Sequence, residues 1–246
     1  PTFYRQMAPF AREKRPRALR ISVSAGEALP LATRQLWKEA TGIDMMDGIG
    51  ATEMFHIFIS SVPGHCKPGA IGPVVPGYTA KVVDDEGREL PRGQVGRLAV
   101  VGPTGCRYLA DERQCNYVKD GWNFPGDAFM QDEDGHFHYQ ARADDMIITA
   151  GYNVGAPEVE DALLRHPAVA ECGVIGQPDD ERGMIVHAFC VLKPEHVGDD
   201  AMVKTLQDHV KATIAPFKYP RRISFLDKLP RTETGKLQRF KLKQLK

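Results

Sequence analysis

The sequence predicts an α/β region that leads into a small antiparallel β region and then into a compact α+β unit. Three observations predict this order. Residues 19–24 read as a buried strand, residues 30–40 as a helix and residues 43–46 as a second strand, which is a parallel βαβ unit. Short alternating apolar runs with frequent Gly and Pro follow over residues 69–104 and indicate antiparallel strands. From Asp145 onward, helical and strand patterns alternate again.

The totals of the sequence restrict its class. It has 246 residues, enough for one large domain or two ordinary ones. Apolar residues make up 42% and charged residues 26%, which is typical of a soluble globular protein. The formal net charge is zero, so no global field attracts nucleic acid or an anionic membrane. No apolar run approaches the roughly 20 residues that span a bilayer, and no signal peptide is visible.

The five cysteines are scattered, and no two of them have CxxC spacing. This pattern favours free thiols in a reducing cytosol, so we expect a cytoplasmic protein. The first residue is Pro1 rather than Met, which suggests a fragment or a processed chain. The cysteines are Cys66, Cys106, Cys115, Cys172 and Cys190.

Two turns rich in Asp and Gly predict hairpins in the middle of the chain. Residues 84–87 (DDEG) separate the runs TAKVVD and GRLAVVG, which would form a small antiparallel sheet or β-barrel. Residues 132–135 (DEDG) separate a second pair of strands. Because the pattern changes near residue 145, we predict one domain over residues 1–143 and a smaller one over residues 144–246.

The second domain is predicted from its helix signals. Residues 157–165 form a helix with Pro157 and Glu158 in its first turn. Residues 199–214 form a longer amphipathic helix, because apolar side chains recur on one side of it. The predicted strands of this domain are 170–175, 185–192 and 222–226.

Three segments carry residue types that suit nucleotide chemistry. In DGIGATE, residues 47–53, the glycines admit a close ligand, and the neighbouring hydroxyl and carboxylate suit a phosphate and Mg²⁺. GWNFPGD ends at Asp127, whose carboxylate could accept two ribose hydroxyls. ARADDMIITAGYN, residues 141–153, places charges at the predicted domain boundary. Taken singly, each has an ordinary alternative: a tight turn, a turn aspartate and a polar linker.

The fourth segment is LPRTETGKLQR, in which Lys236 stands where a loop meets a helix. Pro230 and Gly235 prevent a helix through its middle. Taken alone, a lysine in such a place is most simply a solvated side chain at a mobile tip.

Together and in this order, the four segments resemble the adenylate-forming superfamily of acyl- and aryl-CoA synthetases, luciferases and peptide-synthetase adenylation domains. The resemblance covers essentially the whole chain and is closest to the benzoate and 2-aminobenzoate CoA ligases. It implies part of a large AMP-binding domain, followed by a small C-terminal domain that swings as a lid. The segments closest to that branch are SAGEALP, DGIGATEMFHIF and GPTGCRYLADERQ.

The resemblance also implies roles for individual residues. The catalytic group would be Lys236 with Thr52 on the α-phosphate and Glu53 on Mg²⁺. Asp144 would be the hinge. The residues expected to bind ATP, AMP or CoA are Gly26, Glu27, Ala28, Ile49, Asp127, Arg142 and Gly151.

The chemistry of adenylation explains the need for a lysine. A carboxylate must attack the anionic α-phosphorus of ATP, and an ammonium between them offsets the repulsion. Afterwards the lysine loop must leave, because the thiol of CoA has to reach the same carbonyl. A hinged lid that presents two faces in turn meets both needs.

The substrate expected from the resemblance is a flat aromatic acid, with 2-aminobenzoate favoured over benzoate. Tyr4, Ile49 and His56 are the candidates for its pocket, and ordinary packing is the alternative for Tyr4 and His56. His136 and His138 share a strand face, but a solvated face is favoured over a zinc site there.

Several alternatives remain open at this stage. Relatives carry a phosphate loop well upstream of these motifs, and no such segment exists here, so we expect a fragment that does not turn over alone and leaves apolar surface exposed. A medium-chain fatty acyl-CoA synthetase and a non-catalytic, truncated nucleotide-binding piece are the alternative functions. The expected partners are the aromatic acid, ATP and CoA, without nucleic acid or membrane, and a homodimer is left open.

Overall fold

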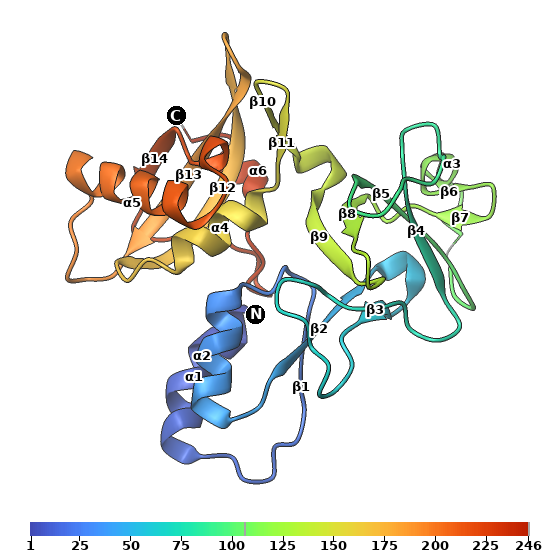
Figure 1. The fold of residues 1–246 in the computed structure, drawn as a ribbon, viewed down its shortest axis with the longest axis horizontal. Coiled ribbons are helices and arrows are strands. Elements are labelled where there is room, and N and C mark those ends of the chain that lie inside the picture. The colour runs from blue at the N-terminus through green and yellow to red at the C-terminus, as the bar shows by residue number, and fades with distance from the viewer. Residues whose placement is uncertain (106, 246) are drawn as a thin grey trace. The chain divides into compact units, whose positions relative to one another are not determined.

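The computed structural model describes residues 1–105 and 107–245, except the side chain of Asp144. The chain divides into two compact units, an N-terminal unit over Phe3–Asp144 and a C-terminal unit over Asp145–Lys246 (Figure 1). Among the described residues, no helix is both long and apolar enough to cross a membrane. Of the predicted cysteines, Cys106 lies outside the described residues, and the other four are free thiols.

The N-terminal unit begins with the predicted βαβ arrangement. Strands β1 and β2 pair in parallel, with Ser22 opposite Met45 and Ala25 opposite Gly48, and α2 is the crossover between them. Strand β3 then returns antiparallel to β2. The elements of this part are α1 (Thr2–Lys14), β1 (Ser22–Ala25), α2 (Leu31–Thr41), β2 (Met45–Gly50), the 3₁₀ turn η1 (Thr52–Met54) and β3 (Ile57–Ser60).

The two helices and this three-stranded sheet share a small core. Trp37 is buried at its centre, and its indole N–H donates to Ser22 Oγ at 2.9 Å. Large apolar side chains are exposed on α1 and at or next to β1, and the sequence predicts such exposure for the strands of residues 19–46. These exposed residues are Phe3, Met7, Phe10, Ile21 and Val23.

The rest of the N-terminal unit is a six-stranded sheet in the order β6-β7-β5-β8-β9, with β4 paired to β5. The sheet is open and not a closed barrel, because its end strands β6 and β9 do not pair with each other among the described residues. An isolated bridge joins Gly72 to Phe137 on β9. Phe129 and Phe137 are fully buried beneath it. Its elements are β4 (Thr79–Val83), β5 (Val95–Val101), α3 (Gln114–Tyr117), β6 (Val118–Lys119), β7 (Trp122–Asn123), β8 (Asp127–Gln131) and β9 (Phe137–Arg142).

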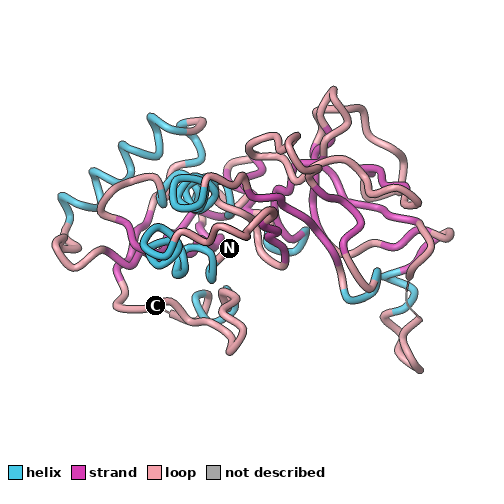
Figure 2. Tube along the Cα trace, turned by 90° about the horizontal axis from the view of Figure 1, so that it is seen from below, coloured by secondary structure: helices cyan, strands magenta, loops and turns pink. Residues whose placement is uncertain are grey.

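The C-terminal unit is a five-stranded sheet covered by α4 and α5 (Figures 1 and 2). Its strand order is β11-β10-β13-β12, and β14 pairs in parallel with β13. Strands β12 and β13 form a long antiparallel hairpin. The elements are η2 (Ala143–Asp145), β10 (Ile147–Thr149), β11 (Tyr152–Val154), α4 (Ala156–Leu164), β12 (Val169–Asp179), β13 (Gly183–Leu192), α5 (Asp200–Thr213), η3 (Pro216–Lys218), β14 (Arg222–Phe225) and α6 (Arg239–Leu242).

Helix α5 shows how the sequence determines an element of this unit. The Asp199 carboxylate accepts the N–H of Met202 at 2.8 Å and so caps the first turn. Leu206 and Val210, four residues apart, are fully buried on its apolar side. The helix therefore lies within one residue of its predicted bounds at each end. Its N-terminal cap and the apolar side chains along one face indicate the same helix.

Candidate functional site

The segment of residues 47–53 forms the end of β2 and the turn into η1. A Cβ atom on Gly50 would lie 2.5 Å from the His56 carbonyl oxygen, so only glycine permits this close passage of backbone. Thr52 is exposed at the start of η1, and Glu53 is partly buried. The hydroxyl of Tyr108 donates to Glu53 Oε1. Tyr108 was not predicted, although it lies in the GPTGCRYLADERQ segment.

Asp47, the first residue of the 47–53 segment, is buried in the three-stranded sheet. Its Oδ1 accepts the N–H of Gly48 at 3.0 Å. Burial raises the pKa of the Asp47 carboxyl to about 7, because desolvation outweighs the hydrogen bond from Gly48. A carboxyl with a pKa near neutral therefore lies on β2, in the same segment as the predicted phosphate-binding residue Thr52.

The predicted adenine-binding residues lie after β1 and along β2. Gly26 has a φ of +85°, which turns the chain as β1 ends. Ala28 is exposed, and Glu27 is partly exposed. Ile49 packs its side chain against the core that contains Met54. The structure thus gives Ile49 a packing contact, and its role in binding stays a prediction.

The structure brings Asp127 and Arg142 together. They face each other in the pairing of β8 with β9, and Arg142 Nη1 lies 3.4 Å from Asp127 Oδ1. Arg142 Nη1 also donates to the Pro125 carbonyl oxygen at 2.8 Å. Gly126 has a φ of +83°, and a Cβ atom there would lie 2.7 Å from Arg142 Nη2. The positive φ favours glycine at this turn, and a larger residue would displace the end of the Arg142 side chain.

The two polar candidates for the acyl pocket have different surroundings. The Tyr4 hydroxyl donates to the Val23 carbonyl oxygen at 2.8 Å, and its ring meets Trp37 edge-on, with ring centroids 4.8 Å apart. This is the packing that the sequence left open for Tyr4. His56 is exposed, and its backbone N–H donates to the Met54 carbonyl oxygen.

The predicted hinge lies at the boundary between the two units, and the predicted tunnel residue lies in the C-terminal unit. Asp144 lies in η2, and its side chain is outside the described part of the structure. Ala150 and Gly151, with φ of +49° and +81°, connect β10 to β11 as the two-residue turn typical of a tight hairpin. The strain of a left-handed alanine therefore lies next to Gly151.

Lys236 lies in a closed turn of the C-terminal unit. A bridge between Arg231 and Leu237 closes the turn, and Gly235 has a φ of +85°. The Lys236 N–H donates to Thr232 Oγ1 at 3.0 Å, and its carbonyl oxygen accepts the Thr232 N–H at 2.8 Å. Its side chain is exposed, and no hydrogen bond or ion pair to its ammonium is present among the described residues. The backbone is held, whereas the sequence suggests a mobile tip.

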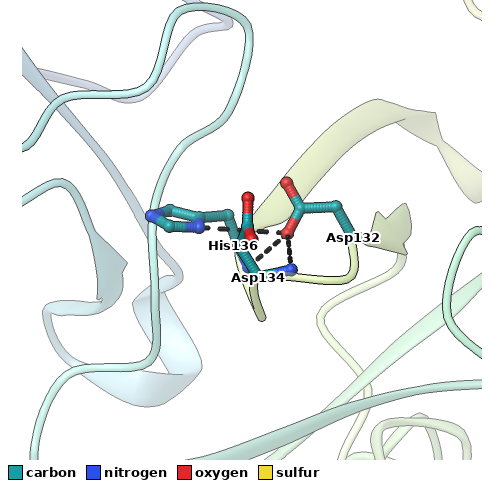
Figure 3. Close-up of side chains that lie close together, drawn as sticks. All are labelled: Asp132, Asp134 and His136. Carbon is teal, nitrogen blue, oxygen red and sulfur yellow. Dashed lines mark hydrogen bonds and ion pairs between the residues drawn. The ribbon is translucent and has the colours of Figure 1, made fainter.

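A metal-like cluster lies elsewhere, in the turn from β8 to β9 (Figure 3). Asp132, Asp134 and His136 offer ligand atoms within 4.8 Å of one another. Lys67 Nζ lies 2.7 Å from both carboxylates and supplies the positive charge that a cation would bring. Burial alone would raise the pKa of Asp132, but hydrogen bonds from His138 and Lys67 outweigh it and hold that pKa well below its usual range. The cluster is a turn in which two carboxylates share one lysine ammonium.

Two family models match the chain. The model described as AMP-binding enzyme matches residues 1–108, and the one described as AMP-binding enzyme C-terminal domain matches residues 158–236. The second match ends at Lys236 itself. The two matched segments therefore contain two of the four motifs that the sequence singles out: residues 47–53 in full and residues 229–239 as far as Lys236.

Several characterised proteins are similar to the chain over most of its length. The benzoate–CoA ligase of Thauera aromatica is 40% identical over 248 residues, which cover 99% of this chain and 47% of that protein. Human mitochondrial acyl-coenzyme A synthetase ACSM5 is 39% identical, over 92% of this chain and 41% of that protein. The crystal structure of the anthranilate CoA ligase AuaEII with anthranoyl-AMP superposes with a TM-score of 0.86 at 45% identity, over 92% of this chain and 44% of that one.

The chain thus spans about half the length of the relatives it matches. Both family models, the similarity to CoA ligases over nearly every residue and the superposition of the fold agree. The chain belongs to the AMP-binding, adenylate-forming enzymes and corresponds to the C-terminal portion of its acyl- and aryl-CoA ligase relatives.

Proposed function

We propose that this chain is the part of an AMP-forming acid–thiol ligase that activates an aromatic carboxylate as its acyl adenylate and passes it to CoA. The favoured acid is 2-aminobenzoate, with benzoate next. The observation that carries the proposal is the Lys236 turn, in which a fixed backbone presents an ammonium without a partner among the described residues. Such a cation suits the stabilisation of charge at the α-phosphorus.

In this proposal the N-terminal unit binds the nucleotide. Thr52, exposed at the start of η1, donates its hydroxyl to the α-phosphate. The buried Asp127 carboxylate accepts the two ribose hydroxyls, and Arg142 fixes its orientation. The turn at Gly26, Glu27 and Ala28 borders the adenine. Ile49 is assigned to both the nucleotide site and the acyl pocket.

The donor set at Glu53 fits a magnesium ion in this proposal. Mg²⁺ is usually held by one or two carboxylates together with substrate phosphates. Glu53 has one oxygen bound to the Tyr108 hydroxyl, which fixes the carboxylate, and the hydroxyl of Thr52 is next to it in sequence. When bound, the ion would neutralise charge on the leaving pyrophosphate.

The C-terminal unit would act as the lid. The boundary between the two compact units falls at Asp144, the residue proposed as hinge. Rotation there would exchange the Lys236 turn for the β10–β11 turn at Gly151, which we assign to the pantetheine arm of CoA. These roles, like the division of labour between residues 1–143 and 144–246, are parts of the proposal.

The identity of the acid is the least constrained part. Anthranilate and benzoate ligases are among the relatives, which supports an aromatic acid, whereas the similarity to an acyl-coenzyme A synthetase supports the medium-chain alternative almost equally. Tyr4 packs on Trp37, so its part in the pocket depends on the ring edge that faces away from that contact. The cytoplasmic location and the homodimer also stay predictions, the latter testable by analytical ultracentrifugation.

The test is acid-dependent ATP–pyrophosphate exchange by the complete gene product. We expect exchange with 2-aminobenzoate and benzoate to exceed exchange with octanoate, and Lys236→Ala to lower the rate by about 10²–10³-fold. Lys228→Ala is the matched control, since Lys228 is an exposed lysine just upstream of the same loop. Undiminished exchange in the Lys236 variant would contradict the assignment. A preference for octanoate would select the medium-chain alternative, and no exchange with any acid would favour a non-catalytic piece.

A further inference from the structure

The main chain around Lys236 is held by several hydrogen bonds, one of them from the Gly235 N–H to the Thr232 carbonyl oxygen at 2.9 Å, and three others bear on Lys236 and the carbonyl before it. Two of them join Lys236 to Thr232, one from the lysine N–H at 3.0 Å and one to its carbonyl oxygen at 2.8 Å. The third reaches the preceding carbonyl, where Arg231 Nη1 donates to the Gly235 oxygen at 2.7 Å. The peptide plane between Gly235 and Lys236 is therefore fixed by a side chain from the start of the same turn.

Arg231 is itself fixed from outside the turn. Its Nε and Nη2 donate to Glu171 Oε2 at 3.1 Å and 2.6 Å. Glu171 is on β12, and the pairing of β12 with β13 is irregular between Val169 and Glu171. Such a bulge redirects a side chain relative to the regular alternation of a strand. One guanidinium thus links an irregular point of the sheet to the carbonyl next to Lys236.

The other end of the turn is anchored separately. Arg239 Nη2 binds both oxygens of Glu160, at 2.6 Å and 2.8 Å. Leu237 packs so closely on β12 that a Cβ atom on Gly173 would lie 2.9 Å from its Cδ2. This anchor holds the chain after Lys236 whether or not Arg231 is present, so a variant of Arg231 should loosen the turn without releasing the segment.

The Arg231–Glu171 pair is too exposed to matter much for stability. Their side chains are 27% and 43% exposed, and ion pairs of this kind contribute about 0–1 kcal/mol. The pair could nevertheless affect the rate of a reaction through the position of a reacting group, because a displacement of about 1 Å can cost about 10²-fold in rate. The geometry of the pair fits a role in orientation better than a role in holding the fold.

We infer that Arg231, held by Glu171, is a positioning residue that sets the direction of the Lys236 side chain through the Gly235 carbonyl. This inference rests on the proposed function only for its effect on catalysis. The conformational part of it, that Arg231 restrains the Gly235–Lys236 peptide, stands on the contacts alone. Arg231 itself touches no reacting group in this account.

The test uses Arg231→Gln, Arg231→Lys and the exchanged pair Arg231→Glu with Glu171→Arg, all in the complete gene product. The exchanged pair restores the opposite charges, but a glutamate cannot donate to the Gly235 carbonyl. Arg165→Gln is the control, because Arg165 forms a comparable exposed ion pair with Asp161 in the same unit. Amide hydrogen exchange at Gly235 and Lys236, thermal midpoint and the two half-reactions are measured for each.

We expect Arg231→Gln to speed exchange of the Gly235 and Lys236 amides at least about 10-fold and to lower the rate constant of adenylate formation by about 10–10²-fold, with little change in the KM for ATP. Transfer from preformed acyl adenylate to CoA should stay within about 2-fold, because Lys236 serves only the first step. The exchanged pair should keep a thermal midpoint close to that of the wild type and should recover neither amide protection nor adenylation.

Three results would overturn the inference: unchanged amide exchange in Arg231→Gln, recovery of both readouts in the exchanged pair, or an equal fall in both half-reactions. If Arg231→Gln fails to fold, the same measurements are made on Arg231→Lys. That variant keeps the positive charge but loses the planar set of donors by which a guanidinium binds two groups at once. If the wild-type protein forms no adenylate from any acid, the proposed function fails, while amide exchange still decides whether Arg231 restrains the turn.

Discussion

The two compact units each bury a titratable side chain in a sheet, and burial moves the two pKa values in opposite directions. Burial raises the pKa of Asp47 in the N-terminal unit to about 7. Burial, aided by the charge of Arg222, lowers the pKa of His187 in the C-terminal unit to about 4. In both places the neutral form is favoured, because the sheet interior solvates charge poorly. An acid becomes neutral by keeping its proton and a base by losing it.

The two units should therefore respond to pH with opposite signs at these residues. Between about pH 4 and 7 folded Asp47 keeps a proton that the unfolded chain releases, so its contribution to stability falls as the pH rises. Between about pH 4 and 6.5 the unfolded chain protonates His187 while the folded unit does not, so stability rises with pH. The comparison shows that one physical cause can give a protein two regions of different pH optimum.

The largest effect is expected from Asp47→Asn. The amide keeps an oxygen for the Gly48 N–H but cannot ionise, so the variant should lose the decline in stability between pH 4 and 7, on the order of 3 kcal/mol. Tryptophan fluorescence during urea unfolding measures it, because both tryptophans, Trp37 and Trp122, lie in the N-terminal unit. The variant is compared with the wild type at each pH, which cancels the other carboxylates.

Asp85→Asn is the matched control, since Asp85 is exposed in the β4–β5 turn. If the stability of Asp47→Asn depends on pH in the same way as that of the wild type, Asp47 does not cause the expected decline in the N-terminal unit.

A somewhat smaller effect, on the order of 2 kcal/mol, is expected from His187→Gln. His187 is 2% exposed, and its Nε2 lies 2.9 Å from Ser224 Oγ, a contact that a glutamine amide could replace. The C-terminal unit of the wild type should weaken as the pH falls from 6.5 toward 4, and the variant should weaken less. Amide hydrogen exchange of β13 measures this; equal acid sensitivity in the two proteins would break the comparison. The exposed His65→Gln serves as the control.

The smallest perturbation is cysteine labelling, which should leave stability unchanged and report on each unit separately. In the native protein an alkylating reagent should modify the exposed Cys115 first and the partly buried Cys66 more slowly. Cys172 and Cys190 should be protected, and burial raises the pKa of the Cys190 thiol to about 12, so little thiolate is present. Peptide mass spectrometry gives the rates, with denatured protein as the reference. Early modification of Cys190 would mean that the C-terminal unit opens readily.

The sequence predicts the fold class where local signals agree. The βαβ unit and the hairpins at residues 84–87 and 132–135 are confirmed, because strand patterns and turn residues point to the same structure. The length of the β12–β13 hairpin was underestimated, since Gly176, Pro178 and Gly183 read as loop residues although they continue the ladder. Helix α1 contains Pro9, a residue that argues against a helix interior, and its packing outweighs that signal.

The sequence predicts those residues of the candidate site that belong to motifs, but not the contacts that these residues make with other parts of the chain. Asp127 and Arg142 come from separate motifs, and the register of β8 with β9 places them opposite each other. Glu171 and Arg231 are 60 positions apart, belong to no shared pattern and meet where the register of β12 with β13 is irregular. Contacts of this kind depend on tertiary packing, which no local periodicity encodes.

The anchor between Arg239 and Glu160 joins positions 79 apart, and β14, which pairs with β13, lies between them in the sequence. During synthesis on the ribosome, α4 and β12 emerge long before the arginine that will neutralise Glu160. Until Arg239 is synthesised, the Glu160 carboxylate, which is 14% exposed in the folded unit, has no arginine to pair with. The segment that carries Lys236 can therefore close onto α4 only after the chain has been synthesised as far as Arg239.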